Sequence, residues 1–240
     1  MRTVLQWLLS LLFNIHMYLA MLVVGIVYLP YALLRPEGAG VAALHYCKYI
    51  RASVAVICGL KIEYRGTPPV GQVLIAAKHQ SFLDVMMIYA ALPRGRFIMK
   101  SELRYTPIVG WYGLRMGCVP VQRGKRAGAI TKMLAEVKAG KSLPGQLIIY
   151  PQGTRVTPGV YAPYKMGTAL LYQQMGTPCY PVATNIGMFW PKLGVMRKRG
   201  TAVVEFLEPI QQGLNNADFM ARLEQDIETN SNALMRAAGL

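Results

Sequence analysis

Residues 72–92 read QVLIAAKHQSFLDVMMIYAAL, and this stretch decides the fold. It begins with a short apolar run, residues 72–77, whose length suits a buried strand. The polar residues KHQS follow at 78–81, and residues 82–92 then have the apolar composition and length of a helix. A strand that leads directly into a helix is the repeating unit of α/β proteins.

The same alternation continues along the rest of the chain after residue 60. Besides 72–77, strands are expected at 61–65, 96–99, 117–122, 145–150, 179–185 and 201–208. Besides 82–92, helices are expected at 127–139, 164–175 and 217–237. Residues 186–200 form the longest irregular stretch. The pattern predicts an α/β fold over 61–240, with a mainly parallel layered sheet and flanking helices.

The start of the chain is apolar enough to enter a membrane. No charged side chain occurs from Thr3 to Leu34. As one helix this segment would be roughly 48 Å long, against a hydrocarbon core of about 30 Å. The apolar region of a cleaved signal peptide is only about 7–15 residues long. A membrane-anchoring segment is therefore expected, and a single span and a re-entrant helical hairpin both fit.

Two polar stripes refine the expectation for residues 1–60. The first consists of Thr3, Gln6, Ser10 and Asn14, which share one helical face and are typical of an interfacial helix near the headgroups. The second consists of His45, Lys48 and Arg51, at three-residue steps within residues 41–60. This second segment is interpreted as an amphipathic helix that rests on the membrane or on the domain, and not as a second full span.

Charge is scarce in this chain, and most of it is positive. The 240 residues are 53% hydrophobic and 15% charged, against a usual charged share of about 25%, which excludes a disordered chain. Lys and Arg number 26 and Asp and Glu 11, and the net charge is +15. This excess of positive charge predicts that the protein binds an anionic membrane surface or a phosphorylated ligand. Nucleic acid is not expected as a partner, because it would leave the apolar start unexplained.

The cysteines do not indicate a metal site. They are Cys47, Cys58, Cys118 and Cys179. No pair has the C-x-x-C spacing that favours zinc, so no metal is expected. The four thiols are interpreted as small buried apolar groups in a reducing compartment.

Polar clusters follow four of the expected strands. They are KHQS at 78–81, KSE at 100–102, RGKR at 123–126 and PQGTR at 151–155. Ligands of open α/β sheets bind beyond the carboxyl ends of the strands, so these clusters predict one site with mostly positive charge.

His79 is the expected base at that site, since His16 and His45 belong to the apolar N-terminal region. Asp84 follows five residues later, in the first turn of the expected helix. It could accept a hydrogen bond from one ring nitrogen and strengthen the other as a base. The alternative is that Asp84 only stabilises the start of the helix and that His79 is an ordinary loop residue.

Four motifs, in this order, resemble those of the glycerolipid acyltransferases. They are VLIAAKHQSFLD at 73–84, with the pattern H-x-x-x-x-D, GCVPVQR at 117–123, YPQGTR at 150–155, where the family usually has FPEGTR, and YPVA at 180–183. The first and third motifs are specific, and the second and fourth are permissive. The resemblance covers about residues 60–210.

The resemblance implies the activity of an acyltransferase domain at 61–240. Such a domain moves a fatty acyl chain from acyl-coenzyme A or acyl-acyl carrier protein to the free hydroxyl of a lysolipid, here 1-acylglycerol-3-phosphate, and gives phosphatidic acid. These thioesters are co-substrates, and no bound cofactor is implied. Since they are cytoplasmic, the implied location is the cytoplasmic membrane, with the catalytic domain facing the cytoplasm. Membrane lipids and the lysolipid are then the partners, with acyl carrier protein a further candidate.

The resemblance also implies roles for individual residues. His79 takes the hydroxyl proton of the acceptor, and Asp84 orients His79 and stabilises its charge. The acceptor phosphate is assigned first to Arg155, whose guanidinium can grip phosphate with two hydrogen bonds, and next to Lys100 and Arg123. Backbone N–H groups around Gly153 and Thr154 are expected to bind phosphate or the reaction's oxyanion.

Gln152 departs from the third motif, which usually has glutamate there. The turn should survive because Gly153 remains, and the amide could still hold Arg155 by a hydrogen bond. The change leaves lyso-ornithine lipid and lysophosphatidylcholine open as acceptors. A non-catalytic protein that binds anionic lipid is the further alternative. Other basic residues are expected at the surface, where they suit anionic headgroups or an acidic carrier protein; they are Lys125, Arg126, Arg197 and Lys198.

Overall fold

Seven strands form one sheet in the part of the chain that the structure describes, which is residues 2–121, 128, 131, 135 and 145–240 of a computed structural model. They are β1 (Leu60–Arg65), β2 (Leu74–Ala77), β3 (Gly95–Lys100), β4 (Val119–Val121), β5 (Gln146–Ile149), β6 (Cys179–Thr184) and β7 (Gly200–Phe206). Their order is β1-β7-β6-β2-β5-β3-β4, and only β6 and β7 pair antiparallel. The expected α/β fold with a mainly parallel sheet is confirmed.

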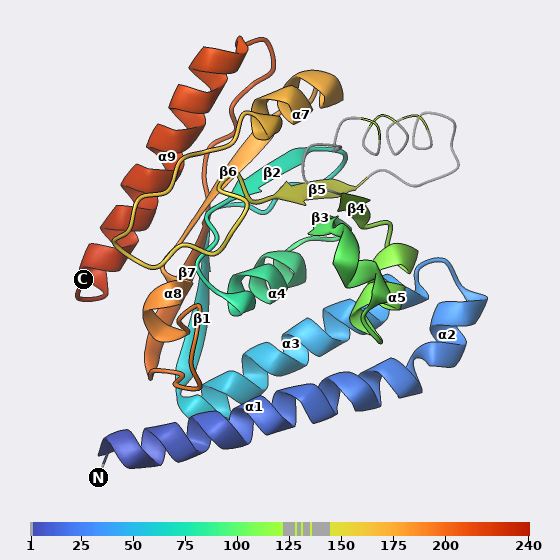
Figure 1. Cartoon of the computed structure of the whole chain (residues 1–240), viewed down its shortest axis with the longest axis vertical. Coiled ribbons are helices and arrows are strands. Elements are labelled where there is room, and N and C mark those ends of the chain that lie inside the picture. The colour runs from blue at the N-terminus through green and yellow to red at the C-terminus, as the bar shows by residue number, and fades with distance from the viewer. Residues whose placement is uncertain (1, 122–127, 129–130, 132–134, 136–144) are drawn as a thin grey trace.

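Helices cover both faces of this sheet (Figure 1). One face lies under α7 (Gly167–Met175) and α9 (Asn216–Ala237), and the other lies under α3 (Gly38–Cys58) and α4 (Phe82–Ala91). The helix expected at 127–139 lies almost wholly outside the described residues. The sequence did not indicate three short elements, which are the 3-10 helix η1 (Ser101–Tyr105), α5 (Val109–Arg115) and α8 (Ile186–Phe189).

Strand β2 is buried on both faces, as a strand between two helical layers must be. Leu74 and Ala76 pack with residues of α7 and α9, whereas Ile75 and Ala77 pack with residues of α3 and α4. The side chains therefore alternate between the two layers. Because β2 pairs in parallel with β5, the loops that follow these two strands emerge side by side at one edge of the sheet.

The N-terminal region is a set of three helices, α1 (Arg2–Val27), α2 (Leu29–Leu34) and α3. Figure 1 shows α3 between α1 and α4, so α1 lies farthest from the sheet. Both α1 and α3 are long and apolar enough to cross a membrane by length and composition. His45, Lys48 and Arg51 are exposed on one face of α3, as expected, and the opposite face packs on the domain.

The polar stripe of α1 does not face the headgroups, contrary to expectation. The Gln6 side chain donates to the Arg197 carbonyl at 2.7 Å, and Asn14 donates to the Val195 carbonyl at 3.2 Å. The hydroxyl of Ser10, which is fully buried, accepts from the Arg197 N–H at 2.9 Å. The stripe therefore attaches α1 to residues 195–197. The exposed face of α1 is apolar and includes Leu8, Leu12, Ile15, Leu19 and Val23.

Candidate functional site

The loop after β2 continues the alternation of that strand. Lys78 and Gln80 turn to the α9 side, where the Lys78 ammonium binds Glu228 and the Gln80 amide contacts the Met235 sulfur. His79, between them, turns to the opposite side of the sheet and binds Asp84. Contacts with α9 thus hold Lys78 and Gln80, the two neighbours of His79, on the face of the sheet opposite to the imidazole.

Asp84 holds His79 in the way that the spacing predicted. The His79 Nδ1 lies 2.9 Å from Asp84 Oδ1, and the carboxylate is fully buried while the imidazole keeps 16% of its surface exposed. A carboxylate can only accept, so Nδ1 carries the proton and Nε2 is left as the basic nitrogen. The other oxygen, Oδ2, accepts from the N–H groups of Gln80 at 2.8 Å and Ser81 at 2.7 Å.

The alternative role of Asp84, at the start of a helix, is also real. Ser81 is the N-cap of α4, and Ser81 and Asp84 form a reciprocal capping box. One carboxylate therefore orients the imidazole and caps the helix at the same time. The two roles share a residue because the helix begins directly after the histidine loop.

Tyr150, at the end of β5, stacks on the His79 ring with centroids 4.0 Å apart and an interplanar angle of 20°. Burial raises the pKa of Tyr150, and the nearby Asp84 carboxylate raises it further. Its hydroxyl is buried and finds no hydrogen-bond partner among the residues described. The sequence gives Tyr150 no role, although its tyrosine, where the third motif usually has phenylalanine, is a signal.

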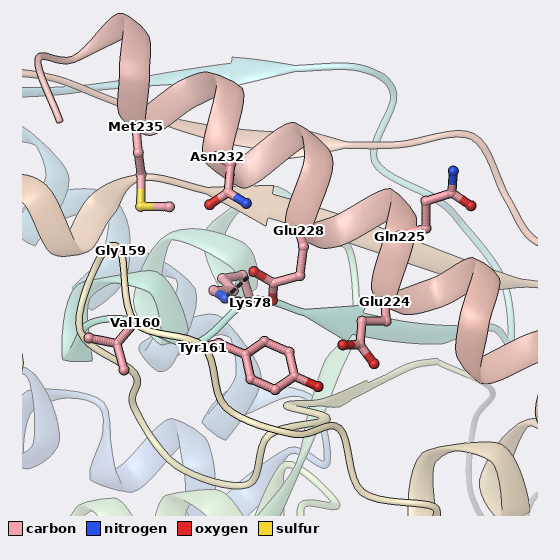
Figure 2. A pocket seen from close by; sticks show the side chains of 9 residues that line it. All are labelled: Lys78, Gly159, Val160, Tyr161, Glu224, Gln225, Glu228, Asn232 and Met235. Atoms are coloured by element: carbon pink, nitrogen blue, oxygen red, sulfur yellow. Dashed lines mark hydrogen bonds and ion pairs between the residues drawn. The ribbon is translucent and has the colours of Figure 1, made fainter.

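The Lys78 ammonium lies on the α9 side of the sheet, opposite to His79. This differs from the expectation that the polar clusters form one positively charged site. Lys78 is 2% exposed, and its ammonium lies 2.5 and 2.8 Å from the two carboxylate oxygens of Glu228. The Tyr164 hydroxyl donates to the same carboxylate at 2.9 Å. Lys78 and Glu228 both line a pocket of about 280 Å³. Figure 2 shows the pair between α9 and the loop that contains Gly159.

Arg155 lies next to the histidine loop. The N–H of its neighbour Val156 donates to the His79 carbonyl at 2.7 Å, which joins the loops after β2 and β5. The half-buried Arg155 side chain donates to the Lys192 carbonyl at 3.1 Å. It thereby also contacts the loop before β7.

Gln152 does not hold Arg155, which corrects the expectation. Its side chain is 3% exposed and donates to the carbonyl of Ala162 at 3.1 Å. Gln152 thus closes the long loop after β5 and contributes no charge to the region around His79.

The backbone at Gly153 and Thr154 only partly fits its expected role. Gly153 has φ of +69°, a left-handed backbone conformation that residues with a side chain rarely adopt, so glycine is favoured at this turn. Its N–H already donates to the Tyr150 carbonyl at 2.9 Å. Thr154 is exposed, and it is the residue of the two that remains a candidate for an oxyanion or phosphate.

The other cations expected to bind phosphate have different positions. Lys100 is exposed at the end of β3, and Arg123 lies outside the described residues. Lys100 is not among the residues that line the pocket beside Arg155. That pocket has a volume of about 240 Å³ and lies between α1, the start of α4 and the loop before β7. Its lining residues are Met17, Tyr18, Phe82, Arg155, Trp190, Pro191, Lys192, Gly194 and Arg197.

Arg197 was expected at the surface and is instead 6% exposed. Its guanidinium lies over the Trp190 ring, 4.0 Å from the centroid, and donates to the Asn14 side chain at 2.8 Å. The sequence could not indicate this burial, because it depends on α1, which is more than 180 residues away along the chain.

This arrangement defines a class of protein, an α/β protein with a general base held by a buried carboxylate beside a cationic pocket. Nε2 of His79 can take a proton from a hydroxyl, and Arg155 can bind an anionic group nearby. The Acyltransferase family matches residues 61–185, just over half of the chain, and the chain belongs to that family.

Several known proteins are similar to this chain. The 1-acyl-sn-glycerol-3-phosphate acyltransferase of Pseudomonas aeruginosa is 26% identical over 162 residues, which are 67% of this chain and 63% of the relative. The human 1-acyl-sn-glycerol-3-phosphate acyltransferase beta is 30% identical over 200 residues, 80% of this chain and 71% of the relative. The crystal structure of the 1-acyl-sn-glycerophosphate (LPA) acyltransferase PlsC from Thermotoga maritima matches with a TM-score of 0.81, 21% identity and 98% coverage of both chains. This last likeness shows the fold.

The similarity does not extend over the full length of every relative. This chain spans 63% of the Pseudomonas aeruginosa protein and 46% of the 1-acyl-sn-glycerol-3-phosphate acyltransferase of Saccharomyces cerevisiae, to which it is 32% identical.

Proposed function

We propose that this protein transfers a fatty acyl chain from an acyl thioester to the free hydroxyl of 1-acylglycerol-3-phosphate, giving phosphatidic acid in phospholipid biosynthesis. The observation that carries this proposal is the His79–Asp84 pair, whose Nδ1 is fixed and whose Nε2 is free to act as a base. The names of the relatives from Pseudomonas aeruginosa and human support the same acceptor and reaction.

The reaction needs one base and no enzyme nucleophile. Nε2 of His79 takes the proton of the acceptor hydroxyl as its oxygen attacks the thioester carbonyl. The tetrahedral intermediate then expels the thiolate, which receives the proton from His79, so the enzyme returns to its starting state. Asp84 stabilises the imidazolium that exists between the two proton transfers. The N–H of Thr154 is a candidate to stabilise the oxyanion.

The position of Gln152 supports a phosphate-bearing acceptor. The amide faces Ala162 and does not line the pocket beside Arg155, so the departure from the usual glutamate leaves the charge of that pocket unchanged. A zwitterionic or ornithine-bearing lysolipid would bring less negative charge to the pocket. We therefore keep lysophosphatidylcholine and lyso-ornithine lipid as competing acceptors in the test.

We propose residues 1–60 as the membrane-anchoring part and 61–240 as the acyltransferase domain. The apolar outer face of α1 supports association with a membrane, where the lysolipid substrate also resides. The thioester donor, acyl-coenzyme A or acyl-acyl carrier protein, is cytoplasmic. The proposed location is therefore the cytoplasmic membrane, with the domain on the cytoplasmic side.

The test is an acyl-transfer assay on the purified protein with a radiolabelled acyl chain. Acyl-coenzyme A and acyl-acyl carrier protein are each supplied with 1-acylglycerol-3-phosphate, lysophosphatidylcholine or lyso-ornithine lipid. Labelled phosphatidic acid is expected, and the His79→Ala variant should form almost none. Faster transfer to another lysolipid would show that 1-acylglycerol-3-phosphate is not the preferred acceptor. Binding of anionic vesicles without transfer to any acceptor would favour the non-catalytic alternative.

A further inference from the structure

The loop before β7 contributes two cations to the pocket beside Arg155. Lys192 and Arg197 line the pocket together with Arg155, and the lining contains no carboxylate. Neither residue belongs to the four motifs. Among the residues described, no aspartate or glutamate forms an ion pair with any of the three cations.

Arg197 is the most unusual of the three because it is a buried cation with neutral partners only. Its terminal nitrogens donate to the carbonyls of Gly194 at 3.0 Å and Met196 at 3.1 Å and to the Asn14 amide oxygen at 2.8 Å. Its Nε is buried and has no hydrogen-bond partner in the described part of the chain. Burial lowers the pKa of Arg197 to about 10, so the guanidinium still carries its charge at neutral pH.

A buried charge without a counter-ion is costly, and such charges are normally paired. The described lining of the pocket contains no negative group to balance its cations. An anionic ligand would supply one. Its apolar walls come from Met17 and Tyr18 of α1 and from Phe82 at the start of α4. A volume of about 240 Å³ is somewhat below the roughly 300 Å³ of the smallest pockets for drug-sized ligands. It suits a headgroup and not an acyl chain.

We propose that Lys192 and Arg197, together with Arg155, bind the phosphate monoester of the acceptor and set the preference for a phosphate-bearing lysolipid. This inference rests on the proposed function. Phe82 lies three residues after His79, and Val156 bonds to the His79 carbonyl, so the pocket adjoins the base. The acyl chain of the lysolipid can leave the pocket along the exposed apolar face of α1, on which Tyr18 lies.

The test measures equilibrium binding without a thioester donor, so that it does not depend on catalysis. Lysophosphatidic acid and the phosphate-free 1-acylglycerol are each titrated, in detergent, against wild type, Arg197→Met, Lys192→Met and Arg199→Met. Arg199 is exposed, is two residues from Arg197 and does not line the pocket, so it is the matched control. Loss of one charge-assisted contact should weaken lysophosphatidic acid binding roughly ten- to a hundredfold in Arg197→Met and Lys192→Met. Arg199→Met should bind as the wild type does, and 1-acylglycerol binding should not change.

A fourth variant separates phosphate binding from the attachment of α1. Asn14→Ala removes the hydrogen bond between α1 and the Arg197 guanidinium but keeps the cation. Binding close to wild type in Asn14→Ala supports the proposal. An equal loss in Asn14→Ala and Arg197→Met, with Lys192→Met unchanged, would overturn it, because Arg197 would then act only as an attachment. Equal affinity of the wild type for the two lipids would also overturn it.

The outcomes distinguish this inference from the proposed function. If the wild type acylates lysophosphatidic acid while Arg197→Met and Lys192→Met bind it normally, the function stands and the phosphate site is wrong. If binding depends on both cations but no thioester yields phosphatidic acid, the site stands and the proposed reaction is wrong.

Discussion

The two oxygens of Asp84 have different partners, so substitutions at the two members of the catalytic pair should differ in their effects. His79→Ala removes the base and should lower turnover by about 10²–10⁴-fold, with little loss of stability because the imidazole is part-exposed. Asp84→Asn should lower turnover nearly as far and should also lower the melting temperature. An amide has one oxygen and cannot replace all three hydrogen bonds that the carboxylate accepts.

Steady-state acyl transfer and thermal unfolding of both variants check this prediction. Circular dichroism provides the control that each variant is folded. Turnover near that of the wild type in His79→Ala would contradict the general-base role. Equal melting temperatures of the two variants would contradict the capping role of Asp84.

A substitution at Tyr150 should raise stability, whereas Asp84→Asn should lower it. The buried hydroxyl of Tyr150 has no partner in the described residues, while its ring stacks on His79. Tyr150→Phe keeps the ring and removes the unsatisfied hydroxyl, so stability should rise by about 1 kcal/mol and the melting temperature by roughly 2–4 °C. Activity should be retained. A loss of turnover at unchanged stability would instead show that the hydroxyl takes part in the reaction.

Residues that are close in the sequence were the predictable part of the site. His79 and Asp84 are five residues apart on one loop and helix start, so local spacing was enough to predict their contact. The roles of Lys78 and Arg197 depend on Glu228 and Asn14, each in a distant helix, and the role of Gln152 depends on how the long loop after β5 folds back to Ala162. Sequence spacing does not indicate which charges such distant contacts bury.

At the scale of elements, α9 fixes the catalytic loop through the Lys78–Glu228 pair. Glu228→Gln leaves the nearly fully buried ammonium of Lys78 without its counter-ion and should cost about 3 kcal/mol of unfolding free energy. Lys78→Met should cost less, because the Glu228 side chain is 19% exposed and water can solvate it. The double variant should regain part of the loss, since no charge is then left unpaired.

Denaturant unfolding of the three variants measures these differences. Asp226→Asn on the same helix is the matched control, because it breaks the exposed Arg222–Asp226 pair and should cost at most about 0.5 kcal/mol. A cost for Glu228→Gln no greater than that of the control would refute the role of the buried pair.

Elements with a strong apolar pattern were predictable, and short ones were not. Each expected strand is present, and the clearest signals are runs that contain four or more apolar residues, as at 72–77, 145–150, 179–185 and 201–208. Helices α5 and α8 have seven and four residues, too few to show a helical period. The polar stripe on α1 was predicted, but the prediction that it faces the lipid headgroups was wrong. A polar face indicates that something polar lies opposite, and here that is the 195–197 backbone instead of headgroups.

At the scale of the whole molecule, the outer face of α1 should decide membrane binding. Leu8, Leu12 and Leu19 are each more than half exposed on that face. Their replacement by glutamine should shift the protein from membranes to the soluble fraction by more than tenfold, since each buried leucine contributes about 1.5–3 kcal/mol. Flotation with anionic vesicles measures the shift.

The control for this experiment uses exposed apolar residues elsewhere, with Val160, Met166 and Leu170 replaced by glutamine. This triple variant should remain bound to membranes, and equal release of both triple variants would contradict the assignment of the α1 face. Deletion of residues 1–35 is a poorer test. Phe13 and Met17 belong to the main core, so the deletion would destabilise the domain as well as remove the anchor.

The position of β1 has a consequence for how the chain is made. β1 pairs only with β7 within the described sheet, so its neighbour is synthesised about 140 residues later. At roughly 5–20 residues per second, a ribosome needs about 7–28 seconds for that interval. The carbonyls that Gln6 and Asn14 bind, at 195–197, also emerge late. The N-terminal helices are therefore synthesised well before their partners in the domain. During that interval their apolar surface is free to bind a bilayer, so membrane association can precede folding of the domain.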